Sequence, residues 1–163
     1  MITVGILTMS DKGSRGERED LSGKEIERMI KDLPAEVKAY EIIPDEADII
    51  KAKLKEFTDQ KRLDVILTTG GTGVSPRDVT PDATREVIEK ELPGMTEAMR
   101  AESMKKTPNA MISRAVCGIR KQSLIINLPG SPKAARENLA VVLPAISHAV
   151  EKIKGGQEEC GKA

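Results

Sequence analysis

Residues 64–82 read DVILTTGGTGVSPRDVTPD, and the fold follows from this stretch. Its run Val65-Ile66-Leu67 is apolar and rich in β-branched residues, which is typical of a buried strand. Three glycines in the four residues 70–73 end that strand. Thr80-Pro81-Asp82 then begins a helix, with Thr80 predicted as the N-cap and Pro81 in the first helical position. The stretch predicts a strand that enters a helix through a glycine loop.

The same alternation of strand and helix continues on both sides. Apolar runs predict strands over 2–9, 37–43, 115–119 and 123–128, and helical spacing predicts helices over 21–33, 46–57, 95–104 and 133–153. This order favours an α/β fold of three layers, α-β-α, with a mostly parallel sheet covered on both faces. The last two strands flank a short polar turn and predict a small antiparallel hairpin. We expect one domain over residues 1–154 and a polar tail over 155–163.

Composition excludes several classes of function. Lys plus Arg and Asp plus Glu number 26 each, so no overall charge attracts nucleic acid or an anionic membrane. One Tyr and one Phe offer few rings for stacking bases. Cys117 and Cys160 form no CxxC pair, and no apolar run approaches the ~20 residues of a membrane span. Without a signal-peptide pattern at the N-terminus, we expect a cytoplasmic protein with neither nucleic-acid nor membrane partners.

Polar clusters follow the predicted strands, at Ser10-Asp11, Asp45-Glu46, 69–73 and Gly130-Ser131. The carboxyl ends of parallel strands lie at one edge of a sheet, where ligands bind. The clusters are therefore predicted to meet in one site.

The glycine loop at 70–73 is the densest cluster. Glycine backbone can approach a ligand closely and adopt positive φ, and the loop N–H groups with the Thr69 and Thr72 hydroxyls could cradle phosphate. The loop is neither GxxxxGK[ST] nor GxGxxG. A tight turn without a ligand is an equally good interpretation of the residues alone.

Asp45 and Asp78 are the carboxylates of most interest. Two like charges about 4 Å apart repel by about 4 kcal/mol at an effective dielectric of 20, so aspartates beside a phosphate imply a bridging cation. Mg²⁺ suits carboxylates combined with substrate phosphates and water. The alternative is structural: Asp45 would cap the helix that starts at Glu46, and Asp78 would pair with Arg77.

Residues 68–84, with Ile43-Pro44-Asp45-Glu46 and the segment NLPGSP at 127–132, resemble the MogA/MoaB molybdopterin-binding family, to which the G domain of gephyrin is related. The resemblance covers nearly the whole chain. It implies a molybdopterin adenylyltransferase of molybdenum cofactor biosynthesis, with Mg²⁺ as cofactor and ATP as co-substrate. A binding-only, MoaB-type protein with little turnover is the alternative. The resemblance also implies a homotrimer, or a hexamer, that contacts a molybdate insertase transiently.

Residue roles follow from the same resemblance. It makes Asp45 and Asp78 catalytic and magnesium-binding. It assigns nucleotide contacts to Thr69, Gly70, Gly71, Thr72, Gly73, Gly130 and Ser131, and substrate contacts to Ser10, Asp11, Asp20, Ser22, Arg77, Ser113 and Arg114.

The inventory of residues agrees with that chemistry. A phosphate monoester is already an anionic nucleophile, so positioning and charge neutralisation suffice. The GxSxG and HExxH patterns of acyl hydrolases and metalloproteases do not occur. Cys117 and the single histidine, His148, are predicted to pack in the core or at its edge.

Overall fold

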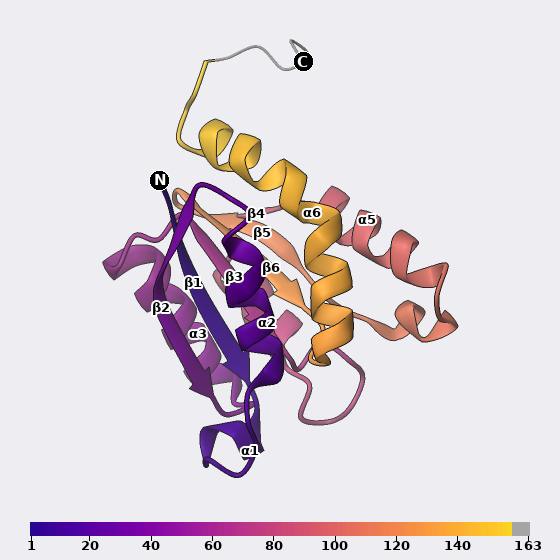
Figure 1. The fold of residues 1–163 in the computed structure, drawn as a ribbon. Helices are drawn as coiled ribbons and strands as arrows, with labels where there is room; N and C mark the ends of the chain where they lie inside the picture. The colour runs from indigo at the N-terminus through magenta and orange to yellow at the C-terminus, as the bar shows by residue number, and fades with distance from the viewer. Residues whose placement is uncertain (158–163) are drawn as a thin grey trace.

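A six-stranded sheet lies between two layers of helices in the computed structural model, which describes residues 1–157 (Figure 1). The strand order is β2-β1-β3-β6-β5-β4. The first four strands are parallel, and β5 and β4 are antiparallel to their neighbours. The predicted three-layer α/β fold with a small antiparallel element is confirmed. The strands are β1 Ile2–Met9, β2 Ala35–Ile43, β3 Val65–Thr69, β4 Lys90–Glu91, β5 Cys117–Arg120 and β6 Ser123–Leu128.

The helices largely follow the apolar spacing of the sequence. They are α1 Asp11–Ser14, α2 Leu21–Ile30, α3 Ala47–Lys55, α4 Thr80–Val87, α5 Pro93–Met104 and α6 Pro132–Ile153, with a π-helical turn η1 Glu56–Gln60 and a 3₁₀ turn η2 Pro108–Ile112. The elements α1, β4 and η2 were not predicted, because they are too short for an apolar period to show.

Side chains of alternate strand residues point to opposite faces of the sheet and pack in two separate cores. In β3, Val65 and Leu67 pack with α2, α5 and α6 on one face of the sheet. Ile66, between them, packs with α3 and α4 on the other face. Figure 1 shows α2, α5 and α6 on one side of the strands and α3 on the other. Because both faces are covered, ligands can reach the sheet only at its edges and strand ends.

Two local expectations are wrong. Val79, not Thr80, is the N-cap of α4; the Thr80 hydroxyl instead donates to the carbonyl oxygen of Gly70 at 2.9 Å. His148 is exposed on α6 rather than placed at the edge of the core. Cys117 is buried as expected, and burial raises the pKa of its thiol to about 12.

Other expectations concern the ends of the chain and the membrane. Cys160 and most of the predicted tail lie outside the described residues. Within residues 1–157, no helix has both the length and the hydrophobicity that crossing a membrane requires.

Asp64 joins three distant parts of the fold at the end of the sheet opposite the glycine loop. Its carboxylate accepts hydrogen bonds from the Thr3 amide at 2.8 Å and the Thr3 hydroxyl at 3.1 Å, and pairs with Lys154 at 2.5 Å. Burial alone would raise the pKa of Asp64, but the hydrogen bonds from Lys154 and Thr3 outweigh burial and lower the pKa. The ionised carboxylate therefore stabilises the folded state.

Replacing this carboxylate by a neutral amide tests that conclusion. We expect Asp64→Asn to lower the free energy of unfolding at pH 7 by about 1–2 kcal/mol, because a charge-assisted bond to Lys154 is lost. Since the folded pKa is lowered, this contribution is complete above the unfolded pKa of about 3.9 and disappears as pH falls through the folded value. Urea unfolding at several pH values measures it. The exposed Asp32→Asn is the control, and equal midpoints for wild type and Asp64→Asn at pH 7 would contradict the assignment.

Candidate functional site

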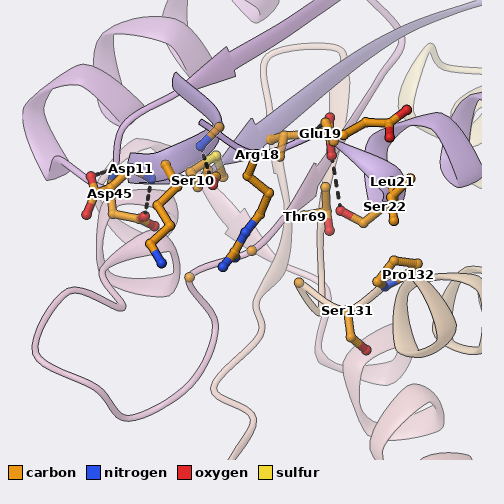
Figure 2. A pocket seen from close by; sticks show the side chains of 18 of the residues that line it. Ser10, Asp11, Arg18, Glu19, Leu21, Ser22, Asp45, Thr69, Ser131 and Pro132 are labelled. Atoms are coloured by element: carbon orange, nitrogen blue, oxygen red, sulfur yellow. Dashed lines mark hydrogen bonds between the residues drawn. The ribbon is translucent and has the colours of Figure 1, made fainter. Parts of the chain in front are cut away.

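A cavity of about 760 Å³ opens at the carboxyl ends of β1 and β3 (Figure 2). The loops that follow β2 and β6 complete its wall. The lining residues are Thr8 to Gly13, Arg18 to Ser22, Asp45, Thr69 to Gly71, Asp78, and Gly130 to Pro132. The polar clusters that follow separate strands in the sequence thus meet in one place, as predicted.

The glycine loop is a tight turn that faces this cavity. Gly70 has φ +98° and Gly71 φ +68°, values that disfavour any residue with a side chain. A Cβ on Gly70 would lie 2.4 Å from the carbonyl oxygen of Met9, at the end of β1. The Thr69 hydroxyl donates to the Pro129 carbonyl oxygen at 2.6 Å, which ties the loop to the segment after β6. Glycine is therefore required here by the turn itself, whether or not a ligand binds.

Asp45 lies at the end of β2 and forms a reciprocal pair with Asp11. The Asp11 amide donates to Asp45 Oδ2 at 3.1 Å, and the Asp45 amide donates to Asp11 Oδ1 at 3.0 Å. The alternative role as a helix cap is wrong, because Glu46 is the N-cap of α3 and forms no side-chain capping bond. The Asp45 carboxylate instead lines the cavity.

Burial is the largest cause that raises the pKa of Asp45. The Asp11 amide lowers this pKa, but the negative charges of Asp11 and Asp78 raise it again, and the net shift is upward. The surroundings of Asp45 therefore disfavour its charged form, which is common at functional sites. A cation placed beside it would relieve this cost.

Asp78 reaches the same cavity from the end of the glycine loop. Its carboxylate accepts a hydrogen bond from the Ser75 amide at 3.0 Å. The alternative pairing with Arg77 is wrong, because the Arg77 guanidinium turns to other carboxylates. Both aspartates predicted to act together thus lie in one cavity.

Arg77 links the glycine loop to the loops after β1 and β2. Its guanidinium donates to both Asp11 oxygens at 3.0 Å and to Glu46 Oε1 at 2.8 Å. This guanidinium lowers the pKa of Asp11. Arg77 does not line the cavity, so it holds the loops together rather than facing the space where a ligand would lie.

Arg114 supports the glycine loop from outside the cavity. It donates to the carbonyl oxygens of Gly73 at 2.8 Å and Asp78 at 2.6 Å, and it pairs with both Asp82 oxygens at 3.1 Å. Ser113 is its neighbour in the chain and also lies outside the cavity. Ser113 and Arg114 were both predicted to contact substrate, but neither lines the cavity. Thr72 and Gly73, predicted to contact nucleotide, do not line it either.

Asp20 lines the cavity as predicted, but its oxygens are already engaged. It is the N-cap of α2, where it accepts a hydrogen bond from the Gly23 amide at 2.9 Å. It also accepts from the Thr8 hydroxyl at 2.6 Å and from the Tyr40 hydroxyl. Its carboxylate fixes the start of α2 at the rim.

Gly130 and Ser131 place the start of α6 at the cavity. The Ser131 hydroxyl caps this helix of 22 residues by accepting a hydrogen bond from the Ala134 amide at 3.2 Å. The backbone N–H groups at the start of a helix attract anions. The arrangement adds a positive end to a wall that already holds the glycine loop.

Most of the lining residues that sequence reasoning missed come from the stretch that runs from the end of β1 to the start of α2. They are Thr8, Met9, Lys12, Gly13, Arg18, Glu19 and Leu21, with Pro132 from the start of α6. Their proximity to Ser10 and Asp20 in the chain was the available signal. No periodic pattern marks which members of a loop point inward.

The raised pKa of Asp45 predicts an effect on stability. A carboxyl whose folded pKa is raised destabilises the folded state at pH values above its unfolded pKa. We therefore expect Asp45→Asn to raise the urea midpoint at pH 7 without divalent ions, and the gain to vanish below about pH 4, where the carboxyl is protonated in both states. Asp48→Asn, a change at an exposed position of α3, is the control. A lower midpoint for Asp45→Asn would contradict the electrostatic cost.

Comparison with known proteins identifies the family. Residues 5–148 match the family described as "Probable molybdopterin binding domain". The molybdopterin adenylyltransferase of Helicobacter pylori strain J99 is 48% identical over 157 residues, covering 94% of this chain and 89% of that protein. The crystal structure of the molybdopterin biosynthesis enzyme MoaB from Thermus thermophilus superposes with a TM-score of 0.91 at 51% identity, covering 98% of this chain and all of that one. With its glycine turn and two aspartates around one cavity, this chain belongs to the family of molybdopterin-binding domains.

Proposed function

We propose that the protein is a molybdopterin adenylyltransferase that uses ATP and Mg²⁺ in molybdenum cofactor biosynthesis. One observation carries the proposal: Asp45, Asp78 and the glycine turn line a single cavity. Relatives named molybdopterin adenylyltransferase, at 48% identity in H. pylori and 41% in Escherichia coli K12, support it.

The reaction requires no deprotonated protein nucleophile. An oxygen of the molybdopterin terminal phosphate attacks the α-phosphorus of ATP and forms a new P–O–P bond. The bond from the α-phosphorus to the oxygen that bridges to the β-phosphorus breaks, and pyrophosphate leaves with that electron pair. The protein must bring two anions together and stabilise the charge that moves to the leaving group.

The donor set of the cavity fits magnesium. Within residues 1–157, no three His, Cys, Asp or Glu side chains form a ready-made metal site. Asp45 and Asp78 supply two carboxylates, and Mg²⁺ is commonly held by one or two carboxylates together with substrate phosphates and water. These two aspartates would hold the ion. Bound there, Mg²⁺ would neutralise phosphate charge and favour departure of pyrophosphate.

The remaining roles divide by position. We assign nucleotide contacts to Thr69, Gly70, Gly71, Gly130 and Ser131, and contacts to the pterin substrate to Ser10, Asp11 and Ser22, all of which line the cavity. Asp20 orients α2. Thr72, Gly73, Arg77, Ser113 and Arg114 lie behind the loop or bridge it, so we assign them to positioning it.

A binding-only protein is the second candidate. A protein that only bound the pterin would have little need for two carboxylates in one cavity, so we favour the enzyme. The homotrimer and the contact with a molybdate insertase stay predictions from the family resemblance, and the cytoplasmic location stays a prediction from the sequence pattern. Met104, Met111 and Ile112 are exposed apolar side chains on α5 and η2, two elements in contact with each other, and a second copy could cover side chains of this kind.

Removing one carboxylate tests the mechanism. We expect Asp78→Asn to reduce Mg²⁺-dependent pyrophosphate release by about 100-fold or more, as loss of a transition-state electrostatic contact does, while molybdopterin binding is retained. Mass analysis of the adenylylated pterin and a pyrophosphate assay measure the two products. Asp48→Asn is the matched control. Normal turnover in Asp78→Asn would remove this residue from the mechanism.

A substitution in the turn tests the loop. A Cβ on Gly71 would lie 2.5 Å from Thr80 Oγ1 and 3.0 Å from Asp45 Oδ1, at positive φ. We expect Gly71→Ala to cost about 1 kcal/mol of stability or more and to lower turnover by displacing Asp45. Gly94→Ala is the matched control, because its Cβ would meet nothing within 4 Å. Unchanged turnover and ATP affinity by calorimetry would reduce the loop to a structural turn.

A further inference from the structure

The charged groups that line the cavity are not equally available. Asp11 is paired with Arg77, Glu19 pairs with Lys24 at 2.7 Å, and Asp20 is saturated by hydrogen bonds. The lining groups without an ion-pair partner within residues 1–157 are the carboxylates of Asp45 and Asp78 and the cations of Lys12 and Arg18. The cavity thus offers two carboxylates and two cations to whatever enters it.

Arg18 is the lining cation that lies outside the helices. It lies in the connection between α1 and α2, whereas Lys12 lies within α1. Arg18 is exposed and forms neither a hydrogen bond nor an ion pair within residues 1–157. Figure 2 shows its side chain extending into the cavity, between the side that carries Ser10 and Asp45 and the side that carries Thr69 and Ser131.

The connection that carries Arg18 is fixed on both sides. Just before Arg18, the Glu17 amide donates a hydrogen bond to the Lys12 carbonyl oxygen at 3.0 Å, and two residues after Arg18 the carboxylate of Asp20 caps α2. The backbone therefore holds the root of Arg18 at the rim, while the long side chain stays free to reach a ligand.

We infer that Arg18 binds a phosphate group of a substrate, with Lys12 adding positive charge nearby. The inference rests on the proposed function. Asp45 and Asp78 repel phosphate and can bind it only through a bridging cation. The groups that can contact phosphate oxygens directly are therefore the N–H groups of the glycine loop and the side chains of Lys12 and Arg18. A guanidinium presents paired donors that match two phosphate oxygens, which a lysine cannot do.

The phosphate has two sources, the nucleotide and the terminal phosphate of molybdopterin. The shared chemistry is a phosphate dianion or polyphosphate chain that lies between the glycine turn and the start of α6. Comparing ligands that carry different phosphates shows which of the two phosphates Arg18 contacts.

The experiment compares Arg18→Ala, Arg18→Lys and wild type by calorimetry with Mg·ATP and with AMP, and by the KM for molybdopterin in the adenylylation assay. Arg15→Ala is the matched control, because Arg15 belongs to the same connection but pairs with Glu17 and does not line the cavity. We expect Arg18→Ala to weaken binding of one substrate about tenfold or more, as loss of a charge-assisted hydrogen bond does. Arg18→Lys should restore part of the loss, and Arg15→Ala should bind like wild type.

Each outcome decides the question. A loss for ATP but not AMP supports contact with the β- or γ-phosphate, a loss for both supports the α-phosphate, and a raised KM for molybdopterin alone supports the pterin phosphate. If wild type binds and turns over while Arg18→Ala matches it for all three ligands, the inference is overturned and the proposed function stands. If wild type neither binds ATP nor adenylylates molybdopterin, the proposed function fails and the inference with it.

Discussion

The close approach of Gly70 to the Met9 carbonyl oxygen sets the geometry of the site. At 2.4 Å from that oxygen, even a methyl group on Gly70 would be excluded. Backbone therefore packs directly against backbone, and the end of β3 turns sharply beside the end of β1. The positive φ values of Gly70 and Gly71 carry the chain back over the sheet edge, so the segment up to Asp78 returns to the cavity. Without this turn, Asp78 could not share a cavity with Asp45.

Two arginines hold that segment from different sides. Arg77 ties it to Asp11 and Glu46, which follow β1 and β2, and Arg114 binds its carbonyl oxygens from behind. Most of these groups are partly exposed, so each ion pair alone contributes little. Their value is geometric, because together they fix a loop that has no regular secondary structure between Thr69 and Thr80. A fixed loop keeps the carboxylates close although they repel each other.

The repulsion between these carboxylates destabilises the folded state, and the rest of the fold offsets it. Two well-filled cores stabilise the sheet, and the Asp64 contacts tie together β1, β3 and the end of α6 away from the cavity. The site can therefore retain Asp45 as a half-buried carboxylate with a raised pKa. Such local strain at a functional site is typical of enzymes whose ligands restore the balance of charge.

The sequence by itself determined the layers of the fold, its mostly parallel sheet and the meeting of the polar clusters. Apolar period and glycine breaks are local signals, and the geometry of parallel sheets does the rest. Side-chain partners across the fold were decided only by the tertiary structure. Arg77 was expected to face phosphate or Asp78 and pairs with Asp11 and Glu46; Arg114 was expected at the substrate and supports the loop. Arg18 gave no signal in the sequence beyond its proximity to Asp20 in the chain. A long charged side chain has many reachable partners, and the choice depends on which carboxylates the folded chain brings within a few ångströms.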